Sequence, residues 1–374
     1  MTSSSALWIA VLIFAGSAAL TRAMIGLGVK ALPNHRSSHD EPTPSSGGVA
    51  IALAFSAGLM VLYGLEPQAG MRFGMDGARF ALFMGLSLLV ALVSVIDDVW
   101  GAPPASKFIA QCLAALAFVI FIGRIEMLDF LGRGEISLGL WGYGLTVLWI
   151  VFFMNAFNFM DGINGIAGGG AVVAAAFLGC IAFVQGSEFV VFACLALGAA
   201  VLGFLVFNFP AGRIFMGDTG SQFIGFVFAG LAVIGNALPP GGGVQTKLSI
   251  LLVPVLFFPF IFDVLLTLVY RSLRRQNITQ AHRDHLYQIG IRLGASHVAV
   301  TSLYVGLFAL CGLAALYVQR VDAAGRFWIV SGLFLGFSAG AARVYRAGLK
   351  GGVVAPLYSK ATAGVNRRDR RKTR

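Results

Sequence analysis

Two adjacent aspartates, Asp97 and Asp98, follow directly on an apolar run that starts at Phe80. A doubled negative charge therefore stands where a membrane helix would leave the bilayer. Charged groups at membrane depth are uncommon, and they usually mark a transport pathway, a metal site or a reaction. Single aspartates recur at the ends of other apolar runs, at Asp161 and Asp218. These three carboxylate sites suggest a membrane enzyme that handles a metal-bound anion.

An asparagine and an aspartate close the fifth apolar run. Asn158 and Asp161 are three residues apart, and residues at that spacing share one face of a helix. Their amide and carboxylate oxygens are hard donors of the kind that suits Mg²⁺, which keeps some of its water and binds substrate phosphates. Gly162 and Gly165 permit a tight turn or the close approach of a ligand. The structural alternative is a polar helix cap.

A glycine-rich segment, residues 213–221, joins the seventh and eighth apolar runs and begins with Arg213. Thr219 and the neighbouring glycines supply a hydroxyl and flexible backbone just before an expected helix N-terminus, which is a natural site for an anion. Asp218 offers a metal ligand within the same segment. A simple turn is the structural alternative for this segment taken by itself.

The loop after the ninth run combines histidines with arginines. His282 and His285 can present their imidazoles on one side of a short helix, and Arg283 lies between them. Three further arginines between residues 271 and 275 would attract phosphate. Zinc is a weaker interpretation, because no cysteine or third histidine with ligand spacing accompanies the pair.

The composition is that of a membrane protein with many spans. The chain has 374 residues, of which 58% are hydrophobic and 11% charged, and its mean hydropathy is +0.84. Those values exceed what a soluble domain needs to fill its core. The runs are continuous rather than alternating, which favours helices over a β-barrel. We therefore predict an all-α polytopic protein of about eleven spans, near residues 6–27, 47–65, 80–96, 107–123, 141–159, 168–185, 189–209, 221–238, 247–270, 297–318 and 326–345.

Basic residues are concentrated in alternate loops. They occur after the first run, after the ninth run and in the tail that follows the last run. Because cytoplasmic loops carry an excess of lysine and arginine, eleven spans place the N-terminus outside and the C-terminus in the cytoplasm. The same threading brings all the candidate carboxylates and His285 to the cytoplasmic face. Residues 1–345 are expected to form one transmembrane catalytic domain, and residues 346–374 a basic cytoplasmic tail attracted to anionic lipid rather than to nucleic acid.

Taken together and in this order, these segments resemble the polyprenyl-phosphate N-acetylhexosamine-1-phosphate transferases, a family that includes the MraY and WecA enzymes. The similarity runs from Pro33 to about Gln288, and eleven spans in this orientation resemble the WecA branch. The resemblance implies that a sugar 1-phosphate passes from a UDP-sugar to undecaprenyl phosphate. UMP would be released, and the lipid-linked product would begin a cell-surface glycan such as an O-antigen.

The resemblance also implies roles for individual residues. The expected catalytic residues are Asp97, Asp98, Asp161 and His285. The expected metal ligands are Asp218 and Asp98. The expected substrate-binding residues are Asn158, Asn164, Arg213, Thr219, His282 and Arg283.

Two positions depart from the family pattern. Asn164 stands where many relatives have an aspartate, and a His-Arg-Asp-His sequence that begins at His282 replaces the family's His-x-His-His cluster. The second departure resembles transferases that use deoxy N-acetylated sugars. The expected donor is therefore a UDP-activated amino sugar, either an N-acetylated hexosamine or a deoxyhexosamine.

The resemblance further implies Mg²⁺ as cofactor, with Mn²⁺ as a substitute, membrane lipid around the protein, a homodimer, and a bacterial inner membrane location. Two routes stay open for the chemistry. The lipid phosphate can attack directly, positioned or deprotonated by Asp97 or Asp98, or a carboxylate such as Asp218 can first form a covalent intermediate. The competing class is a polytopic transporter or a flippase of lipid-linked sugar. Transporter sites gather near the midplane at repeat interfaces, whereas here the acids cluster at one face and no repeat is found.

Overall fold

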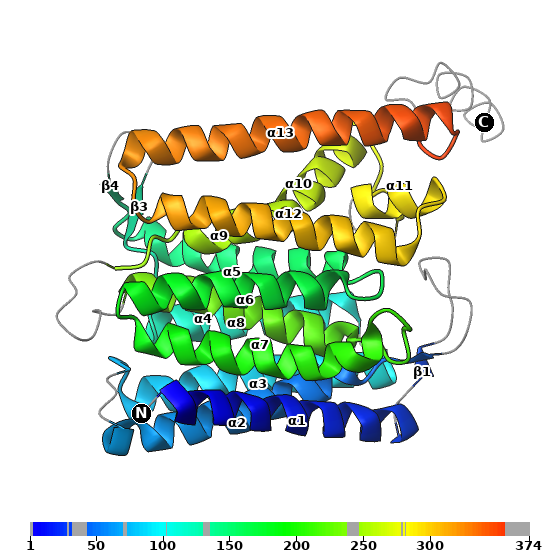
Figure 1. The fold of residues 1–374 in the computed structure, drawn as a ribbon. Helices are drawn as coiled ribbons and strands as arrows, with labels where there is room; N and C mark the ends of the chain where they lie inside the picture. Colours follow the sequence, from blue (N-terminus) through cyan, green and yellow to red (C-terminus); the bar gives the residue numbers. More distant parts are fainter. Residues whose placement is uncertain are drawn as a thin grey trace, which may run out of the picture.

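The computed structural model describes residues 3–27, 30–31, 43–69, 73–101, 103–129, 135–237, 247–277, 280 and 282–355. Arg36 in the first basic loop and residues 356–374 of the expected basic tail lie outside these ranges. Within them the chain is almost entirely helical, and long helices lie side by side in one bundle (Figure 1). The predicted all-α polytopic fold is confirmed.

Ten helices in the described ranges are long and apolar enough to cross a membrane. Their bounds are α1 (Ser3–Leu27), α2 (Gly47–Ala69), α3 (Gly77–Trp100), α4 (Pro104–Phe121), α5 (Trp141–Met160), α6 (Ile166–Val184), α7 (Glu188–Asn208), α8 (Gly217–Ala237), α12 (His297–Val318) and α13 (Ala323–Lys350). Helix α1 begins and α13 ends at opposite ends of the bundle (Figure 1), which an odd number of crossings requires. Which end faces the cytoplasm stays a prediction from loop charge.

The ninth apolar run does not form the single continuous helix that the sequence predicted. It divides into α9 (Leu252–Leu256) and α10 (Phe258–Leu273), and the backbone departs from helical geometry at Phe257, where φ is −95° and ψ is 17°. Pro259 explains the break, because its ring carries no N–H and clashes with the carbonyl four residues earlier. The eleven expected spans are therefore ten continuous helices and one broken segment, whose second half runs obliquely toward α13 (Figure 1).

Short elements occupy the loops at the two ends of the bundle. Strand β1 (Lys30–Ala31) pairs antiparallel with β2 (Thr43–Pro44), and β3 (Met127–Asp129) pairs antiparallel with β4 (Glu135–Ser137). The short helix α11 (Leu286–Arg292) lies at the same end as β1, whereas β3 and β4 lie at the other (Figure 1). The loops that carry the candidate site residues belong to the end with β1 and α11.

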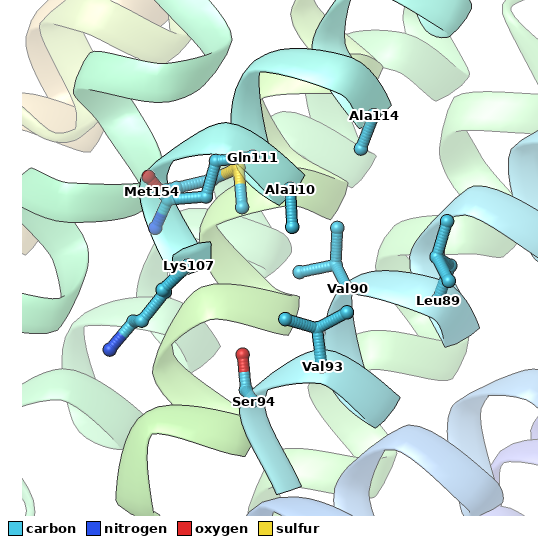
Figure 2. Close-up of a pocket in the computed structure, with 9 residues that line it drawn as sticks. All are labelled: Leu89, Val90, Val93, Ser94, Lys107, Ala110, Gln111, Ala114 and Met154. Atoms are coloured by element: carbon cyan, nitrogen blue, oxygen red, sulfur yellow. The ribbon is translucent and has the colours of Figure 1, made fainter. Parts of the chain in front are cut away.

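Helices α3, α4 and α5 surround a small and largely apolar pocket (Figure 2). Its lining consists of Leu89, Val90, Val93, Ser94, Lys107, Ala110, Gln111, Ala114 and Met154. Lys107 and Gln111 line the pocket from adjacent turns of α4 (Figure 2). Apart from Ser94, these two residues are the polar members of the lining.

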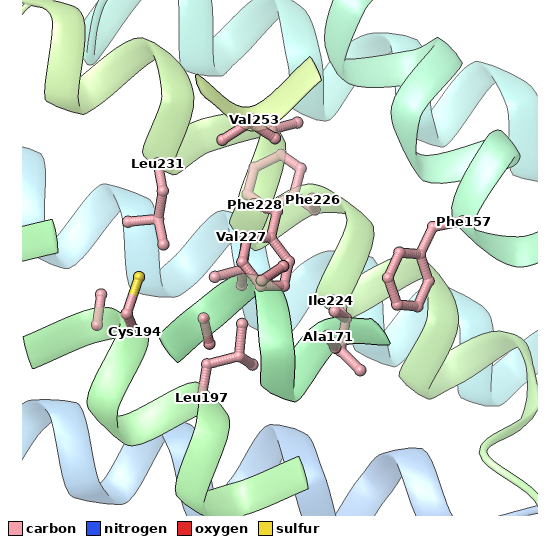
Figure 3. Packing of buried hydrophobic residues seen from close by; sticks show 14 of the residues in the cluster. Phe157, Ala171, Cys194, Leu197, Ile224, Phe226, Val227, Phe228, Leu231 and Val253 are labelled. Carbon is pink, nitrogen blue, oxygen red and sulfur yellow. The ribbon is translucent and has the colours of Figure 1, made fainter. Parts of the chain in front are cut away.

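Helix α8 is the centre of the bundle. Every residue from Thr219 to Gly235 is buried, and α8 packs against α2, α3, α5, α6, α7 and α9. A helix that is buried on all sides and is mostly apolar belongs in the core of the bundle. Figure 3 shows Phe226, Val227 and Phe228 of α8 among side chains from several of these neighbours. Because α8 is fixed on all sides, the residues at its N-terminus have a rigid support.

Candidate active site at one end of the bundle

The carboxylates singled out in the sequence meet at one end of the bundle. Asp97 and Asp98 lie in the last turn of α3, Asp161 directly follows α5, and Asp218 lies in the first turn of α8. Helix α8 packs against both α3 and α5. Segments that are far apart in the chain therefore deliver four acidic side chains to one place, as the sequence predicted.

Asp98 caps the N-terminus of α8. Its Oδ1 accepts a hydrogen bond from the backbone N–H of Asp218 at 3.2 Å, and its Oδ2 accepts from the N–H and the hydroxyl of Thr219 at 3.0 and 2.8 Å. A carboxylate at this position satisfies free backbone donors and faces the positive end of the helix dipole, which together stabilise by about 1–2 kcal/mol. Asp98 thus joins α3 to α8, and the Thr219 hydroxyl is used within the protein.

The backbone at Gly217 brings α8 this close to Asp98. Its φ of +69° lies in the left-handed region, where a side chain is strained. A Cβ atom at this position would also lie 2.9 Å from Asp98 Oδ2. Glycine is therefore required for the turn that presents Asp218 and Thr219 to the end of α3.

Asp218 is held from two sides. Its Oδ1 accepts from Asn158 Nδ2 at 2.8 Å, and its Oδ2 forms an ion pair with Lys107 Nζ. The same ammonium group lies 3.0 Å from Asp97 Oδ2. Asn158 also donates to the hydroxyl of Ser221 at 2.8 Å. Lys107 is therefore the cation that lets two carboxylates from different helices stand close together.

Lys107 is a site residue that the sequence interpretation missed. It opens the fourth apolar run, where a lysine has the usual position of a flanking charge at a cytoplasmic boundary. Its side chain instead points into the bundle and is only 16% exposed. The one signal in the sequence was its place ten residues after Asp97, across a turn that contains two prolines, Pro103 and Pro104.

Asp161 differs from the other carboxylates because no hydrogen-bond or ion-pair partner of its side chain is found among the described residues. It is half-buried and lies close enough to interact electrostatically with Asp218 and Asp98. Burial, followed by those two negative charges, raises the pKa of Asp161 to about 7. A half-buried carboxylate with two acidic neighbours and no counter-charge of its own is a position at which a cation would bind.

We expect Asp161→Asn to stabilise the metal-free protein, and more so at pH 8 than at pH 5. The folded protein raises the pKa from its usual 3.8 to about 7, so the folded state binds more protons than the unfolded chain between these values. Stability that is present at low pH is therefore lost as the pH rises through 7. Apparent melting temperatures in detergent without divalent ions would measure the effect. An equal shift at both pH values would contradict this interpretation.

His285 is buried at the start of α11, beside the end of α5. Its Nδ1 lies 3.2 Å from Asp263 Oδ1, and its ring stacks against Tyr287, whose hydroxyl donates to the Phe159 carbonyl at 3.1 Å. The ring of His282 is centred 5.0 Å from that of His285. The Tyr287 hydroxyl therefore ties the histidine loop to the end of α5, and His285 lies at the same end of the bundle as the carboxylates. Its catalytic role stays a prediction.

Asp263 of α10 is a second residue that the sequence interpretation missed. It is 0% exposed, and it accepts hydrogen bonds from the backbone N–H of Leu286 at 2.9 Å and the hydroxyl of Tyr304 at 2.6 Å. A buried carboxylate needs several donors to offset its lost hydration. Asp263 meets that need by fixing the histidine loop against α10 and α12. A lone acid within an apolar run was its only signal.

The other predicted substrate-binding residues have varied surroundings. Asn164 donates from its amide to the Pro210 carbonyl at 3.3 Å, and its own carbonyl accepts from Thr301 Oγ1 at 2.7 Å. Asn164 therefore joins the segment after α7 to α12. Arg213 is exposed in the loop between α7 and α8, and Arg283 is exposed in the loop before α11. Their substrate-binding roles stay predictions.

Sequence comparison shows the family to which the chain belongs. Residues 80–236, which include Asp97, Asp98, Lys107, Asp161 and Asp218, match the model of glycosyl transferase family 4. A probable undecaprenyl-phosphate N-acetylglucosaminyl 1-phosphate transferase of Bacillus subtilis is 30% identical over 287 residues, which cover 76% of each chain. The chain belongs to glycosyl transferase family 4.

Other relatives in glycosyl transferase family 4 extend the similarity. The decaprenyl-phosphate N-acetylglucosaminephosphotransferase of Mycobacterium tuberculosis is 29% identical over 320 residues, or 80% of this chain and 78% of that protein. The undecaprenyl-phosphate alpha-N-acetylglucosaminyl 1-phosphate transferase of Escherichia coli is 26% identical over 318 residues, or 81% and 80%. The resemblance drawn from the motifs is confirmed, and the protein is an enzyme of this family.

The donor set of this family 4 site suits a weakly coordinated hard cation. In the described part of the chain, no three His, Cys, Asp or Glu side chains are placed to hold a metal by themselves. Mg²⁺ is commonly bound by one or two carboxylates, several waters and substrate phosphates. Asp161, which lacks a partner in the described structure, and the nearby Asp218 fit that pattern. Asp98 keeps lone pairs beyond those used by α8 and stays a candidate ligand.

Proposed function

We propose that this enzyme transfers a sugar 1-phosphate from a UDP-activated amino sugar to undecaprenyl phosphate and releases UMP. The observation that carries the proposal is the convergence of Asp97, Asp98, Asp161 and Asp218 with Lys107 at one end of a transmembrane bundle. Such a site can take a water-soluble nucleotide from one side and a lipid phosphate from the bilayer. The names of the relatives support undecaprenyl phosphate as the acceptor and a sugar 1-phosphate as the transferred group. A transporter or flippase is not favoured.

We propose that Asp161 and Asp218, with Asp98 beside them, hold Mg²⁺. When bound, the ion would offset the negative charge of the two substrates and polarise the donor diphosphate. Asn158 keeps Asp218 in place by donating to its Oδ1, which leaves the carboxylate oriented for a ligand. Asp98 fixes the first turn of α8 and thereby the position of Asp218. The protein supplies preorganised charge, which is the main catalytic need when two anions react.

Asp97 is the carboxylate that we assign to the lipid phosphate. Asp98 accepts three hydrogen bonds from α8, whereas Asp97 accepts a hydrogen bond from the ammonium group of Lys107. An oxygen of the lipid phosphate would attack the β-phosphorus of the donor, and the bond from that phosphorus to the UMP oxygen would break. One phosphoanhydride replaces another. Asp97 would accept the proton of the lipid phosphate, and Lys107 would lower the charge repulsion as the two anions approach.

We propose that the histidine loop recognises the donor. His285 is fixed by Asp263, His282 lies beside it, and Arg283 is exposed on the same loop. The donor would be an N-acetylated hexosamine or deoxyhexosamine. Incubating the purified enzyme with a panel of UDP-sugars, undecaprenyl phosphate and Mg²⁺ tests the proposal. Mass spectrometry of the extracted lipid should then find undecaprenyl-diphosphate-sugar, and the absence of such a product with every donor would reject it.

We expect the C-terminus and the proposed active site to be cytoplasmic, because basic residues gather in the loops at the end of the bundle where α13 finishes. Green fluorescent protein fused after Arg374 should fluoresce, and alkaline phosphatase fused at the same point should be inactive. The reverse pattern would place the carboxylates on the wrong side for a cytoplasmic nucleotide.

A further inference from the structure

Three amide side chains form a second polar layer directly beneath the candidate active site. Gln111 on α4 donates from Nε2 to Gln222 Oε1 on α8 at 2.9 Å. Gln111 Oε1 accepts from Asn155 Nδ2 on α5 at 2.8 Å. Gln111 is 5% exposed and Gln222 is 1% exposed. These three residues form the amide layer.

The amide layer lies one helical turn deeper in the bundle than the site. Gln111 follows Lys107 by four residues on α4, and Figure 2 shows the two side chains one above the other. Gln222 follows Asp218 by four residues on α8, and the third amide precedes Asn158 by three residues on α5. Residues at these spacings share a helical face. Each of three site residues therefore stands above one member of the layer.

The helices that the amide layer joins are the helices that must be in register for the site to exist. Apolar contacts alone leave transmembrane helices free to settle in more than one rotation, because lipid tails are as apolar as the helix faces. A directional hydrogen bond between helices removes that freedom. We propose that Gln111, Asn155 and Gln222 are positioning residues, which set the rotation of α4, α5 and α8 and thereby hold Lys107 against Asp218. The inference rests on the proposed transfer reaction.

One feature of the layer argues against a purely stabilising role. Gln222 Nε2 is buried and has no hydrogen-bond partner within the described chain. Leaving a buried donor unpaired is unfavourable, whereas replacing both partners of such a hydrogen bond by apolar groups of similar shape can be neutral for stability. Leucines would therefore fill this space at least as favourably. What leucines cannot supply is a fixed direction between the three helices.

The test compares Gln111→Leu with the double variant Gln111→Leu/Gln222→Leu. The double variant leaves no glutamine unpaired in the layer, and Asn155 keeps its hydrogen bond to the Val151 carbonyl at 2.8 Å. We therefore expect it to melt within about 3 °C of the unaltered protein. We nevertheless expect its kcat to fall about tenfold or more, since a small misplacement of reacting groups is costly. The KM for the UDP-sugar should change less than kcat, because the donor-binding loop is elsewhere.

A second readout does not depend on turnover. Lys107 is shielded by its ion pairs with Asp97 and Asp218, so an amine-acylating reagent should modify it slowly in the unaltered protein, as followed by mass spectrometry. The reagent should acylate Lys107 several-fold faster in both variants than in the unaltered protein. Ser17→Ala is the matched control, because the buried Ser17 hydroxyl bonds to the Ala200 carbonyl at 2.6 Å in a pair of helices outside the layer. It should change the melting temperature without changing Lys107 labelling.

The values of kcat, labelling rate and melting temperature together distinguish a positioning role from a purely structural one. Lower kcat and faster labelling at a nearly unchanged melting temperature would support positioning. Unchanged labelling, with kcat that only follows the melting temperature as in Ser17→Ala, would overturn it. If the unaltered protein gives no turnover with any UDP-sugar, the proposed function fails instead, and the labelling rates still decide whether the layer positions Lys107.

Discussion

Asp218→Asn should leave the protein folded and remove nearly all of its turnover. The change preserves the volume of the side chain, but it removes a negative charge from the turn that fits Mg²⁺ and breaks the ion pair with Lys107. Catalysis that brings two anions together is mainly electrostatic. Losing one charged ligand plausibly raises the barrier by about 3 kcal/mol or more, which is on the order of a hundredfold or more in rate.

The measurement is UMP release by the purified variant across a series of Mg²⁺ concentrations. Asp322→Asn is the matched control, because Asp322 also stands at a helix N-terminus but at the opposite end of the bundle, and asparagine caps helices as well as aspartate does. The control should keep normal turnover. Near-normal turnover of Asp218→Asn at any magnesium concentration would remove Asp218 from the metal site.

Lys107→Met should reduce turnover by a comparable factor. Without the ammonium group, the carboxylates of Asp97 and Asp218 would face each other with no shared counter-charge. Removing one partner of a buried ion pair costs about 3–5 kcal/mol, and the partial exposure of Asp218 reduces that figure. We therefore expect a loss on the order of a hundredfold in kcat, together with a lower melting temperature.

Two comparisons make the Lys107 result specific. Lys107→Arg keeps the charge and should recover part of the activity, although the guanidinium group fits this position less well. Lys350→Met removes an exposed lysine at the end of α13 and should be silent. If Lys107→Met and Lys350→Met behave alike, Lys107 is an ordinary boundary residue and the convergence described here has no catalytic meaning.

The acidic residues could be found from the sequence because charged side chains are uncommon next to apolar membrane-spanning segments. Asp97, Asp98 and Asp218 stand next to apolar runs where a charge needs a reason, and their common end follows from counting spans. The broken ninth span was missed because hydropathy counts apolar residues and ignores Pro259, although that proline is visible in the sequence. The proline breaks the helix through its missing N–H and its ring clash, which hydropathy does not measure.

Residues that act through tertiary contacts were harder to find. Lys107 matches the ordinary pattern of a basic residue at a span boundary, and only the fold shows that its ammonium group bridges two carboxylates. Asp263 was missed for a related reason, because its donors come from α11 and α12, which no local pattern connects to it. The amide of Gln111 likewise gains meaning only from its partners on α5 and α8.

The most direct test of the proposed reaction is UMP release measured with the donor, the lipid and the metal omitted one at a time. Purified enzyme in detergent should release UMP from a UDP-activated N-acetylated amino sugar only when undecaprenyl phosphate and Mg²⁺ are both present, in equal amount to the lipid-linked sugar formed. Release without the lipid would indicate hydrolysis of the donor. No release in the complete mixture with any donor of this class, from protein that melts normally, would contradict the transfer reaction.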